Sequence, residues 1–469
     1  MTMTRFLGTT ALAFALALPL PTLADSFFVT SPADSGDGTL REALEAAAAR
    51  NTGPDTIFIA TDQDITLTAP LFYDGADPLA LTGRGQAIRA SGDFAILTTT
   101  RTQDLAINHL RLLGTGGYSI ESQGPVGAPG LLVDVAEDAT GMVHVHLNAV
   151  EVSGTAGHGI HISDCTLAEE CGGGEGGEGG GSDAGISLSL MDVVLRDTAF
   201  GRFDADGIRV DERGPGDIRF EATGLIVDGV GADGVELDEG QAGDVHATAS
   251  GGGFNGNGAY CDPALLAAFL PDRPEAEFDE GQAPADTIPA PVTGSPDDGC
   301  FERAVDLYDD GSVEAYEFGI DVDDGFDIDE DGPGDIVATF HGTAMTGNFD
   351  EGFDFDEAGL GDVEAAFVFV FAADNVDDAI KISESGLGDV VGTVTTSELI
   401  NNGGVGIVYE EEDDGDLHLV ILRSATVGND SGALGIEAVQ DDDGDGFVSV
   451  IDTEVADGIE VDGAQIDPD

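Results

Sequence analysis

The chain has 469 residues, and its 92 Asp and Glu against 16 Lys and Arg give a formal net charge of −76. This excess of acid excludes binding to nucleic acid or to an anionic membrane, because both need clustered Lys and Arg. Hydrophobic residues still make up 41%, so the chain is not a disordered acidic tail. The 69 glycines follow no Gly-X-Y period, which excludes collagen and indicates many turns.

Residues 1–24 have the pattern of a secretory signal peptide. Arg5 precedes an apolar run from Ala11 to Leu20, and small residues follow as far as Ala24. The run is too short and too rich in Pro to remain as a membrane helix. No later stretch approaches 18 apolar residues, so we expect no membrane insertion. The sequence predicts an exported protein that is secreted, periplasmic or on the cell surface.

Residues 25–55 are expected to form an N-terminal cap of one strand and one short helix. Thr39 and Glu42 are spaced as a capping box, in which each side chain satisfies a backbone amide at the start of the helix. The helix would end at the Asn-Thr-Gly-Pro run that begins at Asn51. One apolar stripe would face the core: Leu40, Ala43, Leu44 and Ala47.

An internal repeat of 27 residues occupies much of the chain. One copy reads DGIRVDERGPGDI from Asp206, and another reads DGFDIDEDGPGDI from Asp324. Apolar and polar residues alternate at the start of each copy, which indicates a strand with one buried face, and a Gly-rich turn follows. A repeat of 27 residues suits three short strands and three turns, whereas a propeller blade needs about 40 residues. Copies start at Asp206, Asp233, Asp324, Glu351, Asp378 and Val405.

The segment from Phe27 to Ile59 resembles the start of exported bacterial right-handed parallel β-helix proteins. Those proteins often carry a "SLREAI"-like helix and then "GPDTI"; here the helix motif reads TLREAL from Thr39, and GPDTI starts at Gly53. The resemblance and the repeat together predict an all-β fold, a right-handed parallel β-helix of roughly a dozen rungs over residues 56–469. The group includes adhesin-like proteins and pectate-lyase-like, polysaccharide-active enzymes, so it implies the fold and no single function.

Two inserts, at about 165–183 and 261–300, interrupt the predicted coil. Each contains a pair of cysteines, so we expect the disulfides Cys165–Cys171 and Cys261–Cys300, in keeping with an exported protein. A zinc site is the alternative, but His158 and His161 both lie upstream of the first pair. A short helix is predicted over 264–269.

Acidic residues recur at fixed positions of the repeat and would stack into columns. Stacked carboxylates repel one another unless cations bridge them, salt screens them or some stay protonated. Calcium is the predicted bridge, because it accepts six to eight oxygens in loose geometry. The alternative is the solvated acidic face of a halophilic protein. A further column, from Asp217 to Asp416, is expected to bond turn amides. The predicted ligands in the columns are Asp329, Glu330, Asp356 and Glu357.

A second candidate calcium site is the turn from Asp441 to Asp452. Its spacing resembles the calcium loop of EF-hand and dockerin modules: Asp441, Asp443 and Asp445 supply carboxylates, and Phe447 supplies a carbonyl. Asp452 stands where most EF-hands have Glu, and no flanking helix is evident.

Candidate catalytic residues are sparse. Gly157-His158-Gly159 resembles an element of polygalacturonase-like enzymes, but His158 also occupies the ordinary opening position of a rung. No acid pair precedes it at the family's spacing, and Arg209 is the only basic residue at a comparable place. We therefore expect a calcium-stiffened, non-enzymatic surface, adhesive or structural module that contacts polysaccharide or cell-surface material. The alternative is a polysaccharide lyase or hydrolase on the same scaffold.

Overall fold

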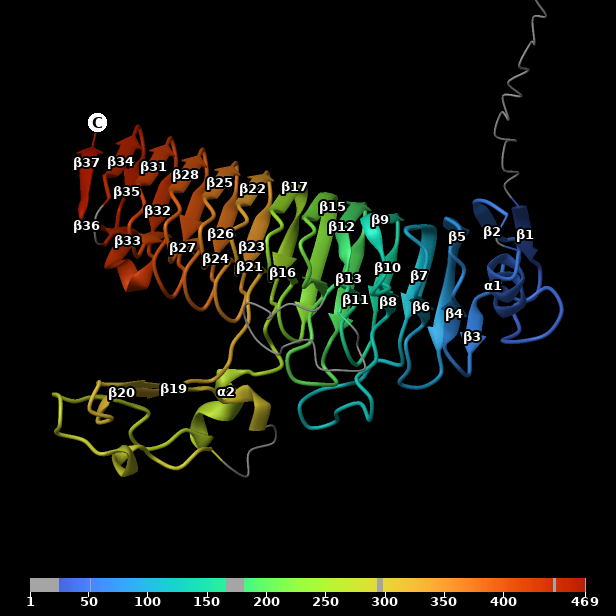
Figure 1. The fold of residues 1–469 in the computed structure, drawn as a ribbon, viewed down its shortest axis with the longest axis horizontal. Coiled ribbons are helices and arrows are strands. Elements are labelled where there is room, and N and C mark those ends of the chain that lie inside the picture. The colour runs from blue at the N-terminus through green and yellow to red at the C-terminus, as the bar shows by residue number, and fades with distance from the viewer. Residues whose placement is uncertain (1–24, 51, 166–180, 293–297, 442–443, 469) are drawn as a thin grey trace, which may run out of the picture.

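The computed structural model describes residues 25–50, 52–165, 181–292, 298–441 and 444–468. The predicted signal peptide, Cys171 and Asp443 lie outside these ranges. The chain is a right-handed parallel β-helix, and its rungs follow one another in sequence order along one axis (Figure 1). No helix in the described ranges has both the length and the apolar content needed to cross a bilayer.

One face of the coil is a parallel sheet of twelve strands, called sheet 2 here, with one strand from each rung. Inward residues of its strands, such as Ile208 and Val210, are fully buried, whereas the residues between them point outward. Its strands are β4 (Leu71–Tyr73), β6 (Leu97–Thr99), β8 (Leu131–Asp134), β11 (Ile160–Ser163), β14 (Ile208–Glu212), β16 (Val235–Glu239), β21 (Phe326–Glu330), β24 (Phe353–Glu357), β27 (Lys381–Glu384), β30 (Ile407–Glu411), β33 (Leu434–Gln440) and β36 (Gly458–Asp462).

The rest of each rung belongs to a sheet of 22 strands, called sheet 1, which wraps around the other sides of the coil. Its strands are β1 (Asp25–Val29), β2 (Asp55–Ile59), β3 (Ile65–Leu67), β5 (Leu79–Ala90), β7 (Asp104–Leu113), β9 (Thr140–Asn148), β10 (Glu151–Ser153), β12 (Asp183–Met191), β13 (Val194–Thr198), β15 (Ile218–Val230), β17 (Val245–Asn255), β22 (Ile336–His341), β23 (Ala344–Thr346), β25 (Val363–Val368), β26 (Phe371–Ala373), β28 (Val390–Thr395), β29 (Glu398–Ile400), β31 (Leu417–Leu422), β32 (Ala425–Val427), β34 (Gly446–Ile451), β35 (Glu454–Val455) and β37 (Ala464–Pro468).

The 27-residue period is confirmed as the rung length. Phe326 pairs with Phe353, Ile336 with Val363 and Ala344 with Phe371, so all three strands of one rung meet their equivalents 27 residues later. The Gly-rich turns are needed for this close stacking. A Cβ built on Gly361 would lie 1.5 Å from the carbonyl oxygen of Gly334 in the previous rung.

The predicted helix, α1 (Leu40–Ala48), lies at the N-terminal end of the coil (Figure 1) and buries the four predicted apolar residues. The Thr39 hydroxyl accepts the Glu42 amide at 3.3 Å. The Glu42 carboxylate accepts from Gly38, one residue before the amide that a capping box uses. The amide of Thr39 itself donates to the carbonyl of Gly36, so it needs no carboxylate.

The second insert is larger than the sequence suggested, and we call residues 261–320 the arm. It extends to residue 320 and contains an antiparallel sheet with the strand order β18-β20-β19 and a small core of its own. The Cys261–Cys300 disulfide is confirmed. The arm's elements are α2 (Pro263–Leu266), β18 (Glu275–Glu277), β19 (Arg303–Leu307), β20 (Val313–Phe318) and 3₁₀ turns at Ala267–Phe269, Ala285–Thr287 and Asp298–Cys300; a further 3₁₀ turn, Asp430–Gly432, lies in the coil.

Two polar ladders run from rung to rung. The predicted structural column is confirmed, because each aspartate from Asp217 to Asp416 accepts the backbone amide of the equivalent residue in the next rung. The sequence analysis missed the second ladder, a buried row of asparagine side chains bonded to one another. Its members are Asn257, Asn348, Asn375, Asn402 and Asn429.

Candidate functional site

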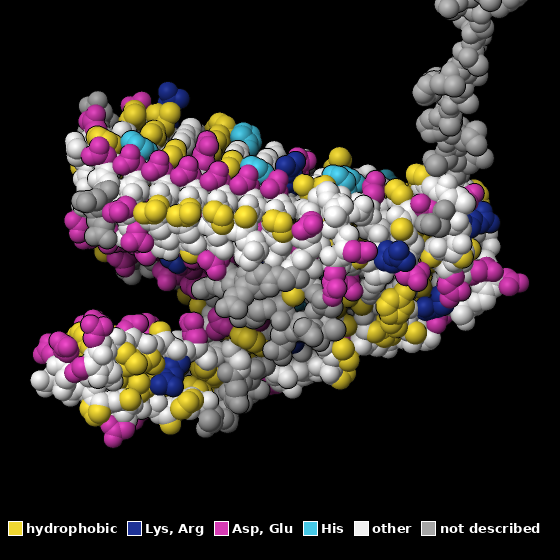
Figure 2. All heavy atoms as spheres, in the orientation of Figure 1, with side chains coloured by type: hydrophobic (Ala, Val, Ile, Leu, Met, Phe, Trp, Pro, Cys, Tyr) yellow, Lys and Arg dark blue, Asp and Glu magenta, His cyan; other side chains and the backbone are white. Residues whose placement is uncertain are grey.

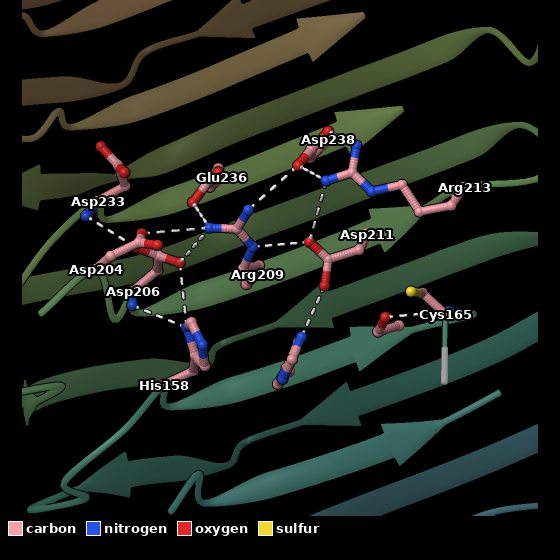
Figure 3. Close-up of polar contacts among 12 residues, drawn as sticks. His158, Cys165, Asp204, Asp206, Arg209, Asp211, Arg213, Asp233, Glu236 and Asp238 are labelled. Atoms are coloured by element: carbon pink, nitrogen blue, oxygen red, sulfur yellow. Dashed lines mark hydrogen bonds and ion pairs between the residues drawn. The ribbon is translucent and has the colours of Figure 1, made fainter. Parts of the chain in front are cut away.

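The most unusual group of side chains lies on the outer face of sheet 2, where β11, β14 and β16 run side by side. Strand register places His161, Arg209 and Glu236 in one outward row across three rungs. Asp211 and Asp238 are neighbours in the parallel row two residues further along the same strands. Because every second residue of a strand points outward, the side chains of these two rows lie next to one another on the outer face of sheet 2 (Figure 3).

Arg209 is the centre of this group. Its Nε lies 2.7 Å from Asp211 Oδ1, and its Nη1 lies 2.5 Å from Glu236 Oε2. Its Nη2 lies 3.2 Å from Asp238, while Asp204 and Asp206 are 3.4 and 3.6 Å from Nη1. One guanidinium is thus shared among five carboxyl groups from two rungs. We call these six residues, together with His158 and His161, the Arg209 cluster.

Arg213 supports the cluster from behind. Its side chain is 1% exposed and forms a two-pronged ion pair with Asp238, with Nη1 2.5 Å from Oδ1. Its backbone amide donates to Asp164, which fixes the start of the turn. Asp238 therefore bridges two arginines, and its position limits where Arg209 can lie (Figure 3).

The two histidines come from the preceding rung. His158 Nδ1 accepts the Asp206 amide at 3.0 Å, and burial lowers the pKa of this histidine, so its imidazole is neutral. His161 Nε2 lies 2.7 Å from Asp211 Oδ2. The two rings lie 4.6 Å apart, so they form one wall of the cluster.

The carboxyl groups of the cluster have pKa values moved in opposite directions. Burial raises the pKa of Glu236 well above its usual value, although Arg209 opposes the shift. For Asp211, the effect of burial is outweighed by Arg209 and His161, which hold its pKa below the usual range. Burial raises the pKa of Asp238 to about 6 despite both arginines. Glu236 can therefore hold a proton while Asp211 is ionised, which is the arrangement of an acid and a base.

The same face continues away from the cluster as an acidic groove. A cavity of about 470 Å³ is lined by Asp329, Asp356, Lys381, Ser383 and Glu410, among others. Acidic side chains border the open space between the coil and the arm (Figure 2). Oxygen atoms of Glu236, Asp327 and Asp329 lie within 4.8 Å of one another, as do those of Asp204, Asp206 and Glu236. Each of these two groups of oxygens could hold a hard cation.

The predicted calcium ligands in the columns lie on two sides of their strands. Asp329 and Asp356 are on the outer face, whereas Glu330 and Glu357 are 1% exposed and accept backbone amides inside the corner of the coil. Adjacent residues of a strand point to opposite sides, so the Asp of each pair faces outward and the Glu faces inward. Calcium binding by these residues stays a prediction.

The predicted loop from Asp441 to Asp452 is partly a strand. β34 starts at Gly446 and pairs with β31 and β37, and the Phe447 ring stacks on His418 at 5.5 Å. The Asp445 amide donates to Asp416, as in the other rungs. Asp443 is outside the described residues. The turn therefore belongs to the coil, and its binding of calcium stays a prediction.

No protein-family model matches this chain, and no curated protein sequence is similar to it. Solved structures are similar in fold. Tailspike protein 2 of an Escherichia coli O157:H7 bacteriophage is 10% identical at a TM-score of 0.43, over 90% of this chain and 44% of that one. A periplasmic alginate epimerase is 9% identical (TM-score 0.37; 88% and 77%). The catalytic unit of an α-1,3-glucanase from Streptomyces thermodiastaticus is 14% identical (TM-score 0.33; 97% and 70%). This chain spans less than half of the tailspike's length.

The sequence-based expectation of a non-enzymatic module is wrong. It rested partly on the scarcity of basic residues beside clustered acids, whereas Arg209 lies within 3.6 Å of five carboxyl groups. The sequence analysis noted Arg209 and His158 but missed their partners, because Asp206 lies 48 residues beyond His158. The 27-residue register was the signal that could have found them.

Proposed function

We propose that this protein is an enzyme that hydrolyses a polysaccharide at the Arg209 cluster. The observation that carries the proposal is the pair of carboxyl groups on either side of one guanidinium, with Glu236 kept protonated and Asp211 kept ionised. Glycoside hydrolysis needs such a pair. The names of the similar structures support a sugar polymer as substrate.

In this mechanism, Glu236 is the general acid that donates its proton to the glycosidic oxygen as the bond to the anomeric carbon breaks. Asp211 is the base that takes a proton from water while the water oxygen bonds to that carbon. Arg209 holds both carboxyl groups in place and keeps Asp211 ionised. Because the pKa of Asp211 is low, it is a poor base for removing a carbon-bound proton, so hydrolysis is favoured over lyase chemistry.

The substrate is expected to be neutral or amino-bearing. A surface with a net charge of −76 repels a polyuronate, and the groove beside the cluster is lined mostly by acids. We also propose that the protein works outside the cytoplasm, which its disulfide supports. The N-terminal sequence of the natural protein tests that point, with Asp25 as the expected first residue.

The test is a reducing-end assay on neutral, amino-sugar and uronic polysaccharides. Glu236→Gln and Asp211→Asn should each lower kcat by about 10²- to 10⁴-fold. Asp354→Asn is the matched control, because Asp354 continues the outward row of Glu236 two rungs away. Unsaturated products on uronic polymers would support a lyase instead. Turnover that neither cluster variant reduces, or that the control reduces equally, contradicts the assignment.

A further inference from the structure

A row of six glutamates runs through the corner of the coil where sheet 2 ends. Strand register stacks each one directly on the equivalent residue of the next rung, without a gap, even across the arm. Every member is at most 1% exposed. We call this set the glutamate row: Glu212, Glu239, Glu330, Glu357, Glu384 and Glu411.

One oxygen of nearly every carboxyl group in the row has a fixed partner. From the second member onward, Oε1 accepts the backbone amide of the glycine four residues later, at 2.9 to 3.1 Å. These glycines belong to the tightly stacked turns that the repeat requires. The turn amides therefore hold the carboxyl groups in a line: the donors are Gly243, Gly334, Gly361, Gly388 and Gly415.

Five of the other oxygens in the row have no ordinary donor. Oε2 of Glu330, Glu357 and Glu384, and both oxygens of Glu212, are buried without a donor from any amide, hydroxyl or cation. What they do face is the carboxyl group of the adjacent rung, within hydrogen-bonding reach. Two carboxylates cannot bond each other, because both only accept. Rungs spaced about 4.8 Å apart would make six buried charges repel strongly.

Gln440 occupies the seventh position of the row and supplies a hydrogen-bond donor to the sixth member, Glu411. Gln440 pairs in register with Glu411, and its Nε2 donates to Glu411 Oε2 while its Oε1 accepts the Leu417 amide. A side chain with a donor thus completes the row at this end. Glu411 receives that donor and has no need of a proton of its own.

We propose that the glutamate row is a proton ladder, in which every second glutamate keeps its proton at neutral pH and donates it to one ionised neighbour. Counting from Gln440, the ionised members are Glu411, Glu357 and Glu239. The protonated members are Glu384, Glu330 and Glu212. Each O–H group then faces a carboxylate, and the unpaired oxygens gain partners.

Burial and the neighbouring acids act in the direction the ladder requires. They raise the pKa of Glu384 to about 8, and those of Glu330 and Glu212 to about 10. Burial also raises the pKa values of the members assigned as ionised, and hydrogen bonds from turn amides and neighbouring carboxyl groups oppose that shift. At the end of the row opposite Gln440, Asp164 faces Glu212 and raises the pKa of Glu212 further. In the described ranges no Lys, Arg or His forms an ion pair with the row.

The ladder makes the coil sensitive to alkali. The folded row binds protons that the unfolded chain releases near pH 4.5, so the free energy of unfolding falls as pH rises above that value. The loss continues through pH 8 to 10, where the protonated members ionise. Below about pH 4 both states are protonated, and this dependence ends.

The first test is the infrared spectrum of the full-length protein. At pH 7, wild type should show the carbonyl band of protonated carboxyl groups, and Glu384→Gln should reduce it by one group. The second test is the Tm from pH 6 to 9, which should fall less in Glu384→Gln because the amide supplies a donor that does not titrate. Glu364→Gln is the control, since it makes the same substitution on an exposed face of β25.

Bound cations are the rival explanation for a row without protons. If they neutralise the row, a chelator will lower the Tm at pH 7 and Glu384→Gln will leave the carboxyl band unchanged. The ladder is also overturned if Glu384→Gln and Glu364→Gln have the same Tm profile and the band does not change. If Glu384→Gln fails to fold, Glu212→Gln replaces it, because Glu212 is also assigned as protonated and lies at the end of the row.

Discussion

Arg209 Nη1 lies 2.5 Å from Oε2 of Glu236, its neighbour in the next rung of the same sheet. The contact shows how a parallel β-helix builds a site from residues 27 positions apart. Four further carboxyl groups lie within 3.6 Å of the same guanidinium. The arginine is therefore the positive charge on which this part of the outer face depends.

Replacing this arginine should destabilise the coil. Arg209→Gln leaves several nearly buried carboxylates without their shared partner, and breaking a buried ion pair in this way costs about 3–5 kcal/mol. Denaturant unfolding measures the loss. Arg219→Gln is the control, because its pair with Asp217 is about half exposed and should contribute at most about 1 kcal/mol. Equal losses in the two variants would mean that the cluster is solvated and does not depend on Arg209.

The pH dependence of the proposed hydrolysis should have one limb. Because the pKa of Glu236 is raised, activity should fall when alkali removes its proton; because the pKa of Asp211 is lowered, acid should not protonate the base above about pH 4. Measurement of kcat/KM from pH 4 to 9 checks both points. An acid limb within this range would assign the base to another carboxyl group.

The regular part of the fold could be predicted from the sequence because it repeats. Copies such as those at Asp324 and Glu351 gave the rung length, and the alternation of Phe353 and Phe355 gave the buried face. The antiparallel sheet of the arm could not be predicted in this way. Strand β20 (Val313–Phe318) occurs once, and its partners β18 and β19 are set by contacts outside the repeat.

The site was only partly visible in the sequence for a related reason. The outward position of Arg209 followed from alternation, but the position of Arg213 did not. Arg213 follows the last residue of its strand and would be expected in solvent, yet it turns back to Asp238 and is buried. Contacts between rungs at a turn depend on backbone direction, which alternation does not encode.

The asparagine ladder should contribute to stability rung by rung. Asn375 Oδ1 accepts both the backbone amide and the side-chain Nδ2 of Asn348, so Asn375→Ala leaves two buried donors unpaired. The expected loss is about 2–4 kcal/mol of unfolding free energy. Asn375→Asp, measured at a pH low enough to protonate its carboxyl group, keeps the acceptor and can donate its O–H to Asn402, so its loss should be smaller. If the aspartate variant is as unstable as the alanine variant, the accepted bonds are not the main contribution.

The Cys261–Cys300 disulfide should hold the arm and not the coil. The bridge joins cysteines 39 residues apart, and closing a loop of that length stabilises by at most about 4 kcal/mol. The arm needs this help, because among its described residues its own core has only four that are buried, Ala283, Val313, Tyr316 and Phe318. In Cys261→Ser with Cys300→Ser, limited proteolysis should cut within residues 262–320 while the coil survives. The double variant is preferable to a reductant, which would also act on Cys165. Cleavage of coil and arm at equal rates would mean that the arm is an integral part of the coil's folding unit, and an arm as resistant as in wild type would mean that the bridge is dispensable.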